Sequence, residues 1–303
     1  MELVISNLSK TYPNGVRALD NISLTIPQGM FGLLGPNGAG KSSLMRTIAT
    51  LQEPDTGTIM FGDTNVLTQK EDVRRMLGYL PQEFGLYPNL SAETILDHFA
   101  VLKGITHSSE RKAQVQYLLN RTNLWENRKK HVGGFSGGMK QRLGIAIALL
   151  GMPKLIIVDE PTAGLDPTER HRFLNLLSEL GENIVIILST HIVEDVRELC
   201  SQMAIIHKGK VALSGEPSNV IENVRGKIWK RFVEKSEMDV IAKEYSVIST
   251  RMIAGKPLVH VYSDVQLSDG FVNIEPDLED VYFQQISLLS ATTQESPTIE
   301  QGA

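Results

Sequence analysis

A glycine-rich stretch between a strand pattern and a helix pattern constrains this chain more than any other feature. Its apolar lead-in, residues 30–34, predicts a buried strand, and residues 43–48 after it predict a helix. The stretch fits the phosphate-binding P-loop pattern G-x-x-x-x-G-K-[ST], and it consists of Gly35, Pro36, Asn37, Gly38, Ala39, Gly40, Lys41, Ser42 and Ser43. A strand, a glycine loop and a helix in this order favour a P-loop over a glycine-rich turn that carries a surface lysine.

Each residue type in this loop suits a phosphate group. The glycines allow positive φ angles, which turn backbone N–H groups inward as an anion nest. The helix after the loop directs the positive end of its dipole at the same place. Lys41 can reach the β- and γ-phosphates of a nucleotide, and the Ser42 hydroxyl can bind Mg²⁺.

Bulk properties exclude several other classes of protein. The formal net charge of -5 gives no indication of nucleic-acid binding. The longest apolar runs, such as residues 143–150, are too short to cross a bilayer, and the N-terminus lacks the features of a signal peptide. A membrane role would therefore require a partner. Cys200 is the one cysteine, so it cannot form an internal disulfide, and we expect a small buried side chain in a reducing compartment.

Acidic residues follow a second buried strand pattern. Residues 155–158 form a continuous apolar run, which is typical of a central parallel strand, and Asp159 and Glu160 come directly after it. Ligands bind at the carboxyl edge of such sheets. Asp159 is placed to hold Mg²⁺, directly or through water, and Glu160 to take a proton from an attacking water. A strand predicted at 183–189 brings His191 to the same edge, although a lone histidine is more often structural.

Two further helix starts carry polar residues. Ser136, Gly137 and Gly138 precede a helix predicted over 139–150, where Ser136 can cap the helix and the glycines leave backbone N–H groups accessible. This is either a second anion-binding helix start or simply a capped helix with a glycine hinge. Asp166 and Pro167 read as the N-cap and first residue of the next helix, which is expected to stop at Gly181.

Alternating strands and helices around the P-loop predict an α/β fold with a three-layer core around a parallel sheet. We expect an antiparallel N-terminal β subdomain and a helical insertion over 83–150 within a first domain, residues 1–220. Residues 221–286 then predict a small α+β accessory domain. Residues 287–303, rich in Ser, Thr, Gln and Glu, predict a disordered tail.

The order of these motifs resembles that of the ABC ATPases over roughly residues 2–220. The resemblance implies ATP and Mg²⁺ as cofactors. It identifies Tyr12 with the A-loop aromatic that stacks on adenine, although the residues alone favour an ordinary loop tyrosine. Gln82 is similar to the Q-loop glutamine, which contacts Mg²⁺ and senses the transport subunit. His191 is similar to the switch histidine beside the γ-phosphate.

Residues 135–139, FSGGM, resemble the LSGGQ signature of these ATPases, and 164–166 resemble their D-loop, which contains Asp166. Phe135 and Met139 depart from the signature, but the serine and both glycines that contact phosphate are kept, so we expect catalysis to survive. The resemblance thus implies the following sets: catalytic Lys41, Gln82, Glu160 and His191; nucleotide-binding Tyr12, 35–43, Ser136, Gly137, Gly138 and Asp166; and Mg²⁺-binding Ser42, Gln82 and Asp159.

Two short motifs favour an export-type ATPase similar to those of drug resistance and sodium export. One is the SGGM variant of the signature. The other is residues 275–282, EPDLEDVY, which resemble the C-terminal P-x-LEDV-aromatic segment of that subfamily.

The resemblance also implies partners. A chain with one P-loop and one SGG motif is expected to pair head to tail with a second ATPase subunit, a homodimer being the first expectation. Transmembrane permease subunits on separate chains would hold it at the cytoplasmic face of the membrane.

Other classes of protein remain as alternatives at this point. A soluble ABC ATPase acting on nucleic acid or ribosomes would usually carry two ATPase domains or long coiled coils. An importer ATPase would usually carry SGGQ and a different C-terminal domain. A P-loop kinase would need neither the SGG motif nor a dimer. The cargo cannot be read from these residues.

Overall fold

The computed structural model describes residues 1–162, 165–180 and 184–294, and it divides into two units, Met1–Val211 and Ala212–Ala303. Three sheets and ten α-helices make up the described part. None of the described helices is long and apolar enough to cross a membrane.

An antiparallel sheet opens the first unit, with strand order β2-β1-β4-β5. Its strands are β1 (Leu3–Thr11), β2 (Arg17–Ile26), β4 (Thr56–Phe61) and β5 (Thr64–Asn65). Buried residues alternate along the second half of β2 and the first half of β1, as they should where one face of a sheet lies against the core.

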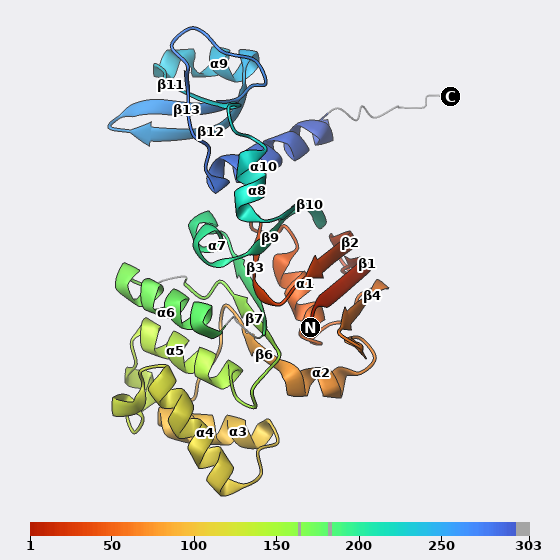
Figure 1. Ribbon diagram of the computed structural model, residues 1–303, viewed down its shortest axis with the longest axis vertical. Coiled ribbons are helices and arrows are strands. Elements are labelled where there is room, and N and C mark those ends of the chain that lie inside the picture. Colours follow the sequence, from red (N-terminus) through yellow and green to blue (C-terminus); the bar gives the residue numbers. More distant parts are fainter. Residues whose placement is uncertain (163–164, 181–183, 295–303) are drawn as a thin grey trace. The chain divides into compact units, whose positions relative to one another are not determined.

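A second sheet of six strands, in the order β10-β9-β3-β8-β7-β6, lies beside it (Figure 1). The strands are β3 (Gly29–Leu34), β6 (Leu77–Leu80), β7 (Leu155–Asp159), β8 (Val185–Thr190), β9 (Gln202–His207) and β10 (Lys210–Gly215). Neighbours from β9 to β6 pair in parallel, and every residue of β7 and β8 is buried. Because Leu34 pairs with Thr190 and Asp159 with Ser189, the ends of β3, β7 and β8 meet at one edge.

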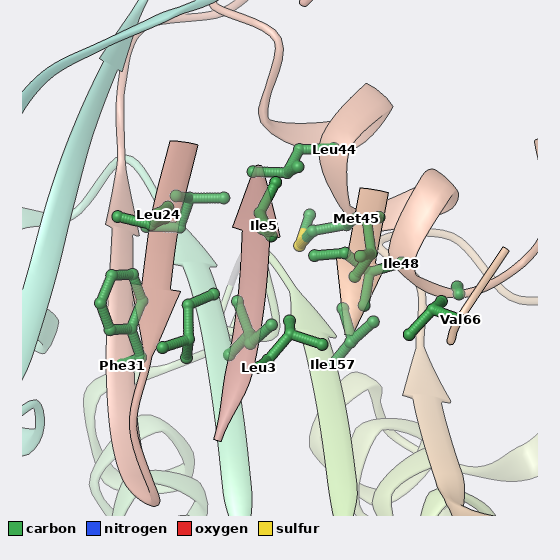
Figure 2. Close-up of a cluster of buried hydrophobic side chains, with 14 of the residues drawn as sticks. Leu3, Ile5, Leu24, Phe31, Leu44, Met45, Ile48, Val66 and Ile157 are labelled. Carbon is green, nitrogen blue, oxygen red and sulfur yellow. The ribbon is translucent and has the colours of Figure 1, made fainter. Parts of the chain in front are cut away.

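The core of this unit lies between the two sheets, around α1 (Lys41–Ile48). Figure 2 shows Leu44, Met45 and Ile48 of that helix among side chains of both sheets, including Ile5 of β1 and Ile157 of β7. All five side chains are essentially inaccessible to solvent. Full burial of an aliphatic side chain contributes about 1.5–3 kcal/mol, so this packing holds the helix and the loop before it firmly in place.

Helices form the rest of the unit. They are α2 (Lys70–Met76), α3 (Ala92–Leu102), α4 (Ser108–Arg121), α5 (Gly137–Ala148), α6 (Pro167–Leu180) and α7 (Val193–Leu199), with 3-10 turns at Trp125–Asn127 and Val132–Gly134. Helices α3, α4 and α5 pack together as a group within this unit (Figure 1). Helix α5 begins two residues before the predicted start. The predicted stop at Gly181 lies outside the described residues.

The second unit contains an antiparallel sheet in the order β12-β13-β11-β14. Its elements are α8 (Pro217–Glu222), β11 (Ile228–Phe232), a 3-10 turn (Lys235–Glu237), α9 (Met238–Glu244), β12 (Ser246–Ile253), β13 (Lys256–Tyr262), β14 (Val272–Asn273) and α10 (Leu278–Gln294). The expectation of a disordered tail from residue 287 is wrong as far as Gln294, because α10 continues through it. Composition suggested disorder there, but Leu288 and Leu289 extend the apolar content of the helix; residues 295–303 lie outside the description.

The motif at 275–282 has a structural role in this unit. Leu278 and Val281 are buried, and between them Glu279 pairs with Arg251 of β12 at 2.6 Å. Asp280 is also buried, and its Oδ1 lies 2.7 Å from Nδ1 of His260 on β13. The two acids of the LEDV segment therefore attach α10 to the sheet of its own unit, and its two apolar residues are buried within that unit.

The two acids of this segment should differ sharply in their effect on stability. Asp280→Ala leaves a buried imidazole nitrogen of His260 without its partner, which typically costs about 1–3 kcal/mol. Glu279→Ala removes an ion pair whose members are each about two-fifths exposed, which is typically worth about 0–1 kcal/mol. Urea unfolding followed by Trp229 fluorescence, in a Trp125→Phe background, would measure both variants. Equal destabilisation would contradict this account.

Candidate active site

A cavity of about 470 Å³ opens at the carboxyl edge of the six-stranded sheet. It brings together residues far apart in the sequence, from the N-terminal sheet, the P-loop and the ends of β6, β7 and β8. Its lining residues are Tyr12, Val16, Ala18, residues 36–43, Gln82, Glu160 and His191. Most of the residues that the sequence assigned to phosphate or nucleotide contact therefore face one space.

The P-loop takes a conformation that only glycine tolerates at its end. Gly40 has a φ of +110°, and a Cβ added there would lie 2.4 Å from the carbonyl oxygen of Ala18. Helix α1 follows with no side-chain cap. A helix start without a side-chain cap among the described residues fits the anion site that the glycine pattern predicts.

Lys41 is buried against this loop. Its Nζ donates to the carbonyl oxygens of Gly35, at 2.6 Å, and Pro36, at 3.3 Å. Burial lowers the pKa of Lys41 below its ordinary value, and the negative charges of Glu160 and Asp159 act in the opposite direction. The ammonium therefore lies beside both acids that the sequence placed at this edge.

Asp159 ends β7 and is 5% exposed. Burial raises the pKa of its carboxyl group, and its Oδ1 has no hydrogen-bond partner among the described residues. A buried carboxylate oxygen without a partner suits a cation. Mg²⁺ is commonly held by one or two carboxylates, waters and substrate phosphates, so Asp159 and the nearby Ser42 hydroxyl fit this ion. The described residues contain no cluster of three or more His, Cys, Asp or Glu that could hold a metal without such help.

Glu160 has the left-handed backbone conformation, with φ +50°, which is uncommon for a residue other than glycine. Its N–H donates to the carbonyl oxygen of Ser189 at 2.8 Å, and its carboxylate contacts Nδ1 of His191 directly. This pairing was not predicted from the sequence. The one indication of it there was that the two residues follow neighbouring strands. Strained backbone of this kind costs about 1–3 kcal/mol and gathers at functional sites.

Tyr12 and Gln82 lie at the opening of the cavity. The Tyr12 hydroxyl is 3.0 Å from Ser43 Oγ and donates to Gln52 Oε1 at 3.0 Å, so the ring is attached to α1 and the loop after it. Gln82 is exposed just beyond β6. Gln52 is a polar residue in a short loop, and no sequence pattern singled it out.

The signature residues and Asp166 do not line this cavity. Ser136 caps α5 by accepting the Met139 N–H at 3.2 Å, and Asp166 caps α6 by accepting the Glu169 N–H at 2.9 Å, which confirms both predicted caps. Gly138 packs so closely on Glu169 that an added Cβ would lie 2.6 Å from Oε2 of that carboxylate. Gly164 of the predicted D-loop lies outside the described residues.

Sequence reasoning also missed a buried acid behind the site. Asp195 on α7 is fully buried; it accepts from Thr162 Oγ1 at 3.1 Å and from Arg170 of α6. It thus ties the loop after Glu160 to both helices. Cys200 nearby is buried as expected, and burial raises the pKa of its thiol to about 12.

The parallel sheet, the P-loop at its carboxyl edge and the acids beside Lys41 define a P-loop nucleoside triphosphatase. Comparison with known proteins narrows this class. The family described as ABC transporter matches residues 19–163. The chain belongs to the ATP-binding proteins of ABC transporters, and it is therefore an ATPase that converts ATP and water to ADP and phosphate.

Individual relatives agree with this assignment. An uncharacterised ABC transporter ATP-binding protein, YxlF of Bacillus subtilis, is 39% identical over 71% of this chain and 70% of its own length. The methionine import ATP-binding protein MetN of Histophilus somni is 34% identical over 80% of the chain and 72% of its own length. The linearmycin resistance ATP-binding protein LnrL of B. subtilis is also 34% identical, over 74% of this chain and 72% of its own length.

Solved structures show the same fold. An ATP-binding subunit of an ABC transporter matches with a TM-score of 0.66 and 30% identity over 74% of this chain and 93% of that one. The dimeric post-hydrolysis structure of MJ0796 bound to ADP and Pi matches with a TM-score of 0.64 and 27% identity, over 71% of this chain and 98% of that one. The α/β fold class predicted from the sequence is confirmed.

Proposed function

We propose that this chain is the ATP-hydrolysing subunit of an exporter, and that it works as a head-to-tail dimer beneath separate membrane-spanning chains. Two ATP molecules would lie at the dimer interface, each between the P-loop of one subunit and the SGG helix start of the other. Hydrolysis would open the dimer, and the cycle of closing and opening would drive transport. A homodimer is the simplest arrangement.

One observation supports the dimer: the signature residues do not line the nucleotide cavity of their own chain. Ser136 and Gly137 are exposed at the start of α5, yet neither they nor the buried Gly138 line the cavity that holds the P-loop and Glu160. A helix start that lies outside its own chain's nucleotide cavity could bind the nucleotide of a second copy. The MJ0796 relative is a dimer with ADP and Pi, which supports the same arrangement here.

Within each site, the roles follow from position. Residues 35–43 hold the phosphates through backbone N–H groups, with Lys41 on the β- and γ-phosphates. Tyr12 stacks on the adenine. Ser42, Asp159 and Gln82 hold Mg²⁺, which when bound neutralises charge on the β- and γ-phosphate oxygens.

Glu160 is the general base in this proposal. Its carboxylate lines the cavity next to the P-loop, and His191 contacts it from the neighbouring strand end. Glu160 accepts the proton of the attacking water, while His191 holds the carboxylate in place and borders the γ-phosphate position. Positioning and charge stabilisation supply most of the rate in phosphoryl transfer, and a general base adds roughly 10²–10⁴-fold.

Two motifs support export over import. The signature reads FSGGM, and the LEDV segment attaches α10 to a four-stranded C-terminal sheet. The named relatives include a resistance protein and an import protein, so the direction of transport rests on those motifs.

The membrane partner is expected to bind the segment from Gln82 to Ser91, between the core and the helical group. This segment is mostly exposed and includes Tyr87, which is 60% exposed, and Leu90. A cytoplasmic helix of the partner would cover these side chains, and the protein would thereby be held at the cytoplasmic face of the membrane.

Capture from membranes tests this proposal. Tagged Glu160→Gln protein, incubated with ATP in detergent-solubilised membranes, is expected to retain a polytopic membrane protein that mass spectrometry identifies. The matched control, Glu160→Gln combined with Lys41→Ala, should retain much less of it because it binds ATP weakly. Recovery of only soluble proteins or ribosomes by the single variant, in repeated trials, would contradict the transporter assignment.

A further inference from the structure

The Tyr12 side chain is held by a hydrogen-bond network that the roles described so far do not use. Tyr12 follows β1, lines the cavity beside Val16 and Ala18, and is half-buried. Its hydroxyl donates to Gln52 Oε1 at 3.0 Å and lies 3.0 Å from Ser43 Oγ. A phenol has one hydrogen to donate, so the Ser43 hydroxyl is the donor in the second contact.

The amide of Gln52 is fully occupied by this network. Its Nε2 donates to the Ser43 carbonyl oxygen at 2.8 Å and to Thr47 Oγ1 at 2.9 Å. The reverse orientation of the amide would place Oε1 against the Ser43 carbonyl oxygen, two acceptors together, so the network itself determines how the amide lies. Gln52 therefore connects the Tyr12 hydroxyl to the first and second turns of α1.

A second residue of the same loop holds the backbone before the ring. Asp55 accepts the Thr11 N–H at 2.6 Å and the Lys10 ammonium at 3.1 Å. The hydrogen bond from the Thr11 N–H lowers the pKa of the Asp55 carboxyl group most, and the hydrogen bond from the Lys10 ammonium lowers it further. The loop after α1 thus positions both the backbone and the hydroxyl of the aromatic residue at the cavity opening.

We infer that Gln52 is a positioning residue for the nucleobase: it holds the Tyr12 ring at a constant position relative to helix α1, which follows the phosphate-binding loop. This inference rests on the proposed function, in which adenine stacks on Tyr12. A ring that is already fixed loses little conformational freedom when a base stacks on it, so the network increases affinity by pre-organisation. Because Ser43 belongs to both the network and the P-loop, the base and phosphate subsites keep a constant separation.

Paired ligands separate this role from a general role in stability. Calorimetric titration with Mg²⁺ present would compare ATP with inorganic tripolyphosphate, which has no base. Gln52→Met keeps the length of the side chain and removes its amide; Tyr12→Phe keeps the ring and removes its hydroxyl. Each is expected to weaken ATP binding about 3- to 10-fold, while tripolyphosphate affinity changes less than about 2-fold.

The double variant and a control complete the test. Gln52→Met with Tyr12→Phe should bind ATP about as well as the weaker single variant, because both remove the same link. Gln69→Met, which removes an amide that accepts the Asn65 N–H on the exposed side of β5, should bind like the wild type. In turnover, Gln52→Met should raise KM and leave kcat unchanged.

Three results would overturn the inference. The first is an ATP affinity of Gln52→Met equal to that of the wild type. The second is an equal loss of affinity for ATP and for tripolyphosphate, which would mean that the substitution disturbs α1. The third is a loss of ATP affinity in the double variant that equals the sum of the two single losses. Failure of the proposed function would give a different result: Lys41→Ala would then bind ATP as tightly as the wild type does. This fourth result would overturn the inference too, because the inference rests on that function.

Discussion

Glu160→Gln is expected to lower ATP turnover by roughly 10²–10⁴-fold, the usual contribution of a general base, while ATP binding persists. The amide oxygen of glutamine can still accept from His191, and the backbone of residue 160 is unaltered, so the geometry of the site should survive. Only the ability to take a proton is lost. Steady-state phosphate release and equilibrium ATP binding would measure the two effects separately.

The same substitution should also accumulate dimer, because closed subunits could no longer hydrolyse the nucleotide between them. Size-exclusion chromatography with ATP would detect this species, and ADP should not produce it. Glu194→Gln is the matched control: its half-exposed carboxylate pairs with Arg197 of α7, and neither residue lines the cavity. Turnover by Glu160→Gln at the wild-type rate would remove this residue from the role of base.

Lys41→Ala and Gly137→Asp should each abolish ATP-dependent dimerisation, and a mixture of the two should restore it. Lys41→Ala removes a charge-assisted contact to phosphate, worth roughly 10- to 100-fold in affinity. No atom of the described residues lies within 4 Å of a Cβ added at Gly137, so aspartate fits the fold there and repels phosphate at the helix start. A head-to-tail mixed dimer keeps one intact site, from the P-loop of one chain and the signature of the other.

Both variants would be made in the Glu160→Gln background and mixed with ATP before chromatography. Gly85→Asp, another exposed glycine with open space around it, serves as the control and should dimerise like its parent. A mixture that remains monomeric, like each variant alone, would count against a shared site.

The fold was largely predictable because it depends on short-range patterns. Strand β7 covers the apolar run at 155–158, and β8 covers most of the strand predicted at 183–189, since burial on both faces leaves a clear trace in sequence. The tail was misjudged because composition alone does not report where a helix ends. Helix α10 continues past residue 287 despite its Ser, Thr and Gln content.

Much of the candidate site was also predictable, for a topological reason. Residues that follow parallel strands reach the same edge of the sheet, so the P-loop, Glu160 and His191 could be placed together before any coordinates. The contacts between side chains could not. The Glu160–His191 pair, the Tyr12–Gln52 link and the buried Asp195 each join residues at least 25 positions apart.

The sequence by itself determined the chemistry that this protein can offer: a glycine loop suited to phosphate, acids at a strand end and a second helix start that combines a serine cap with two glycines. These depend on residue type and local spacing, which backbone geometry converts directly into structure. Only the tertiary structure decided which of these groups share a cavity, and that the signature residues do not line it. Long-range packing sets such distances, because the free energy of burying α1 and β7 depends on the whole core rather than on the residues that perform the chemistry.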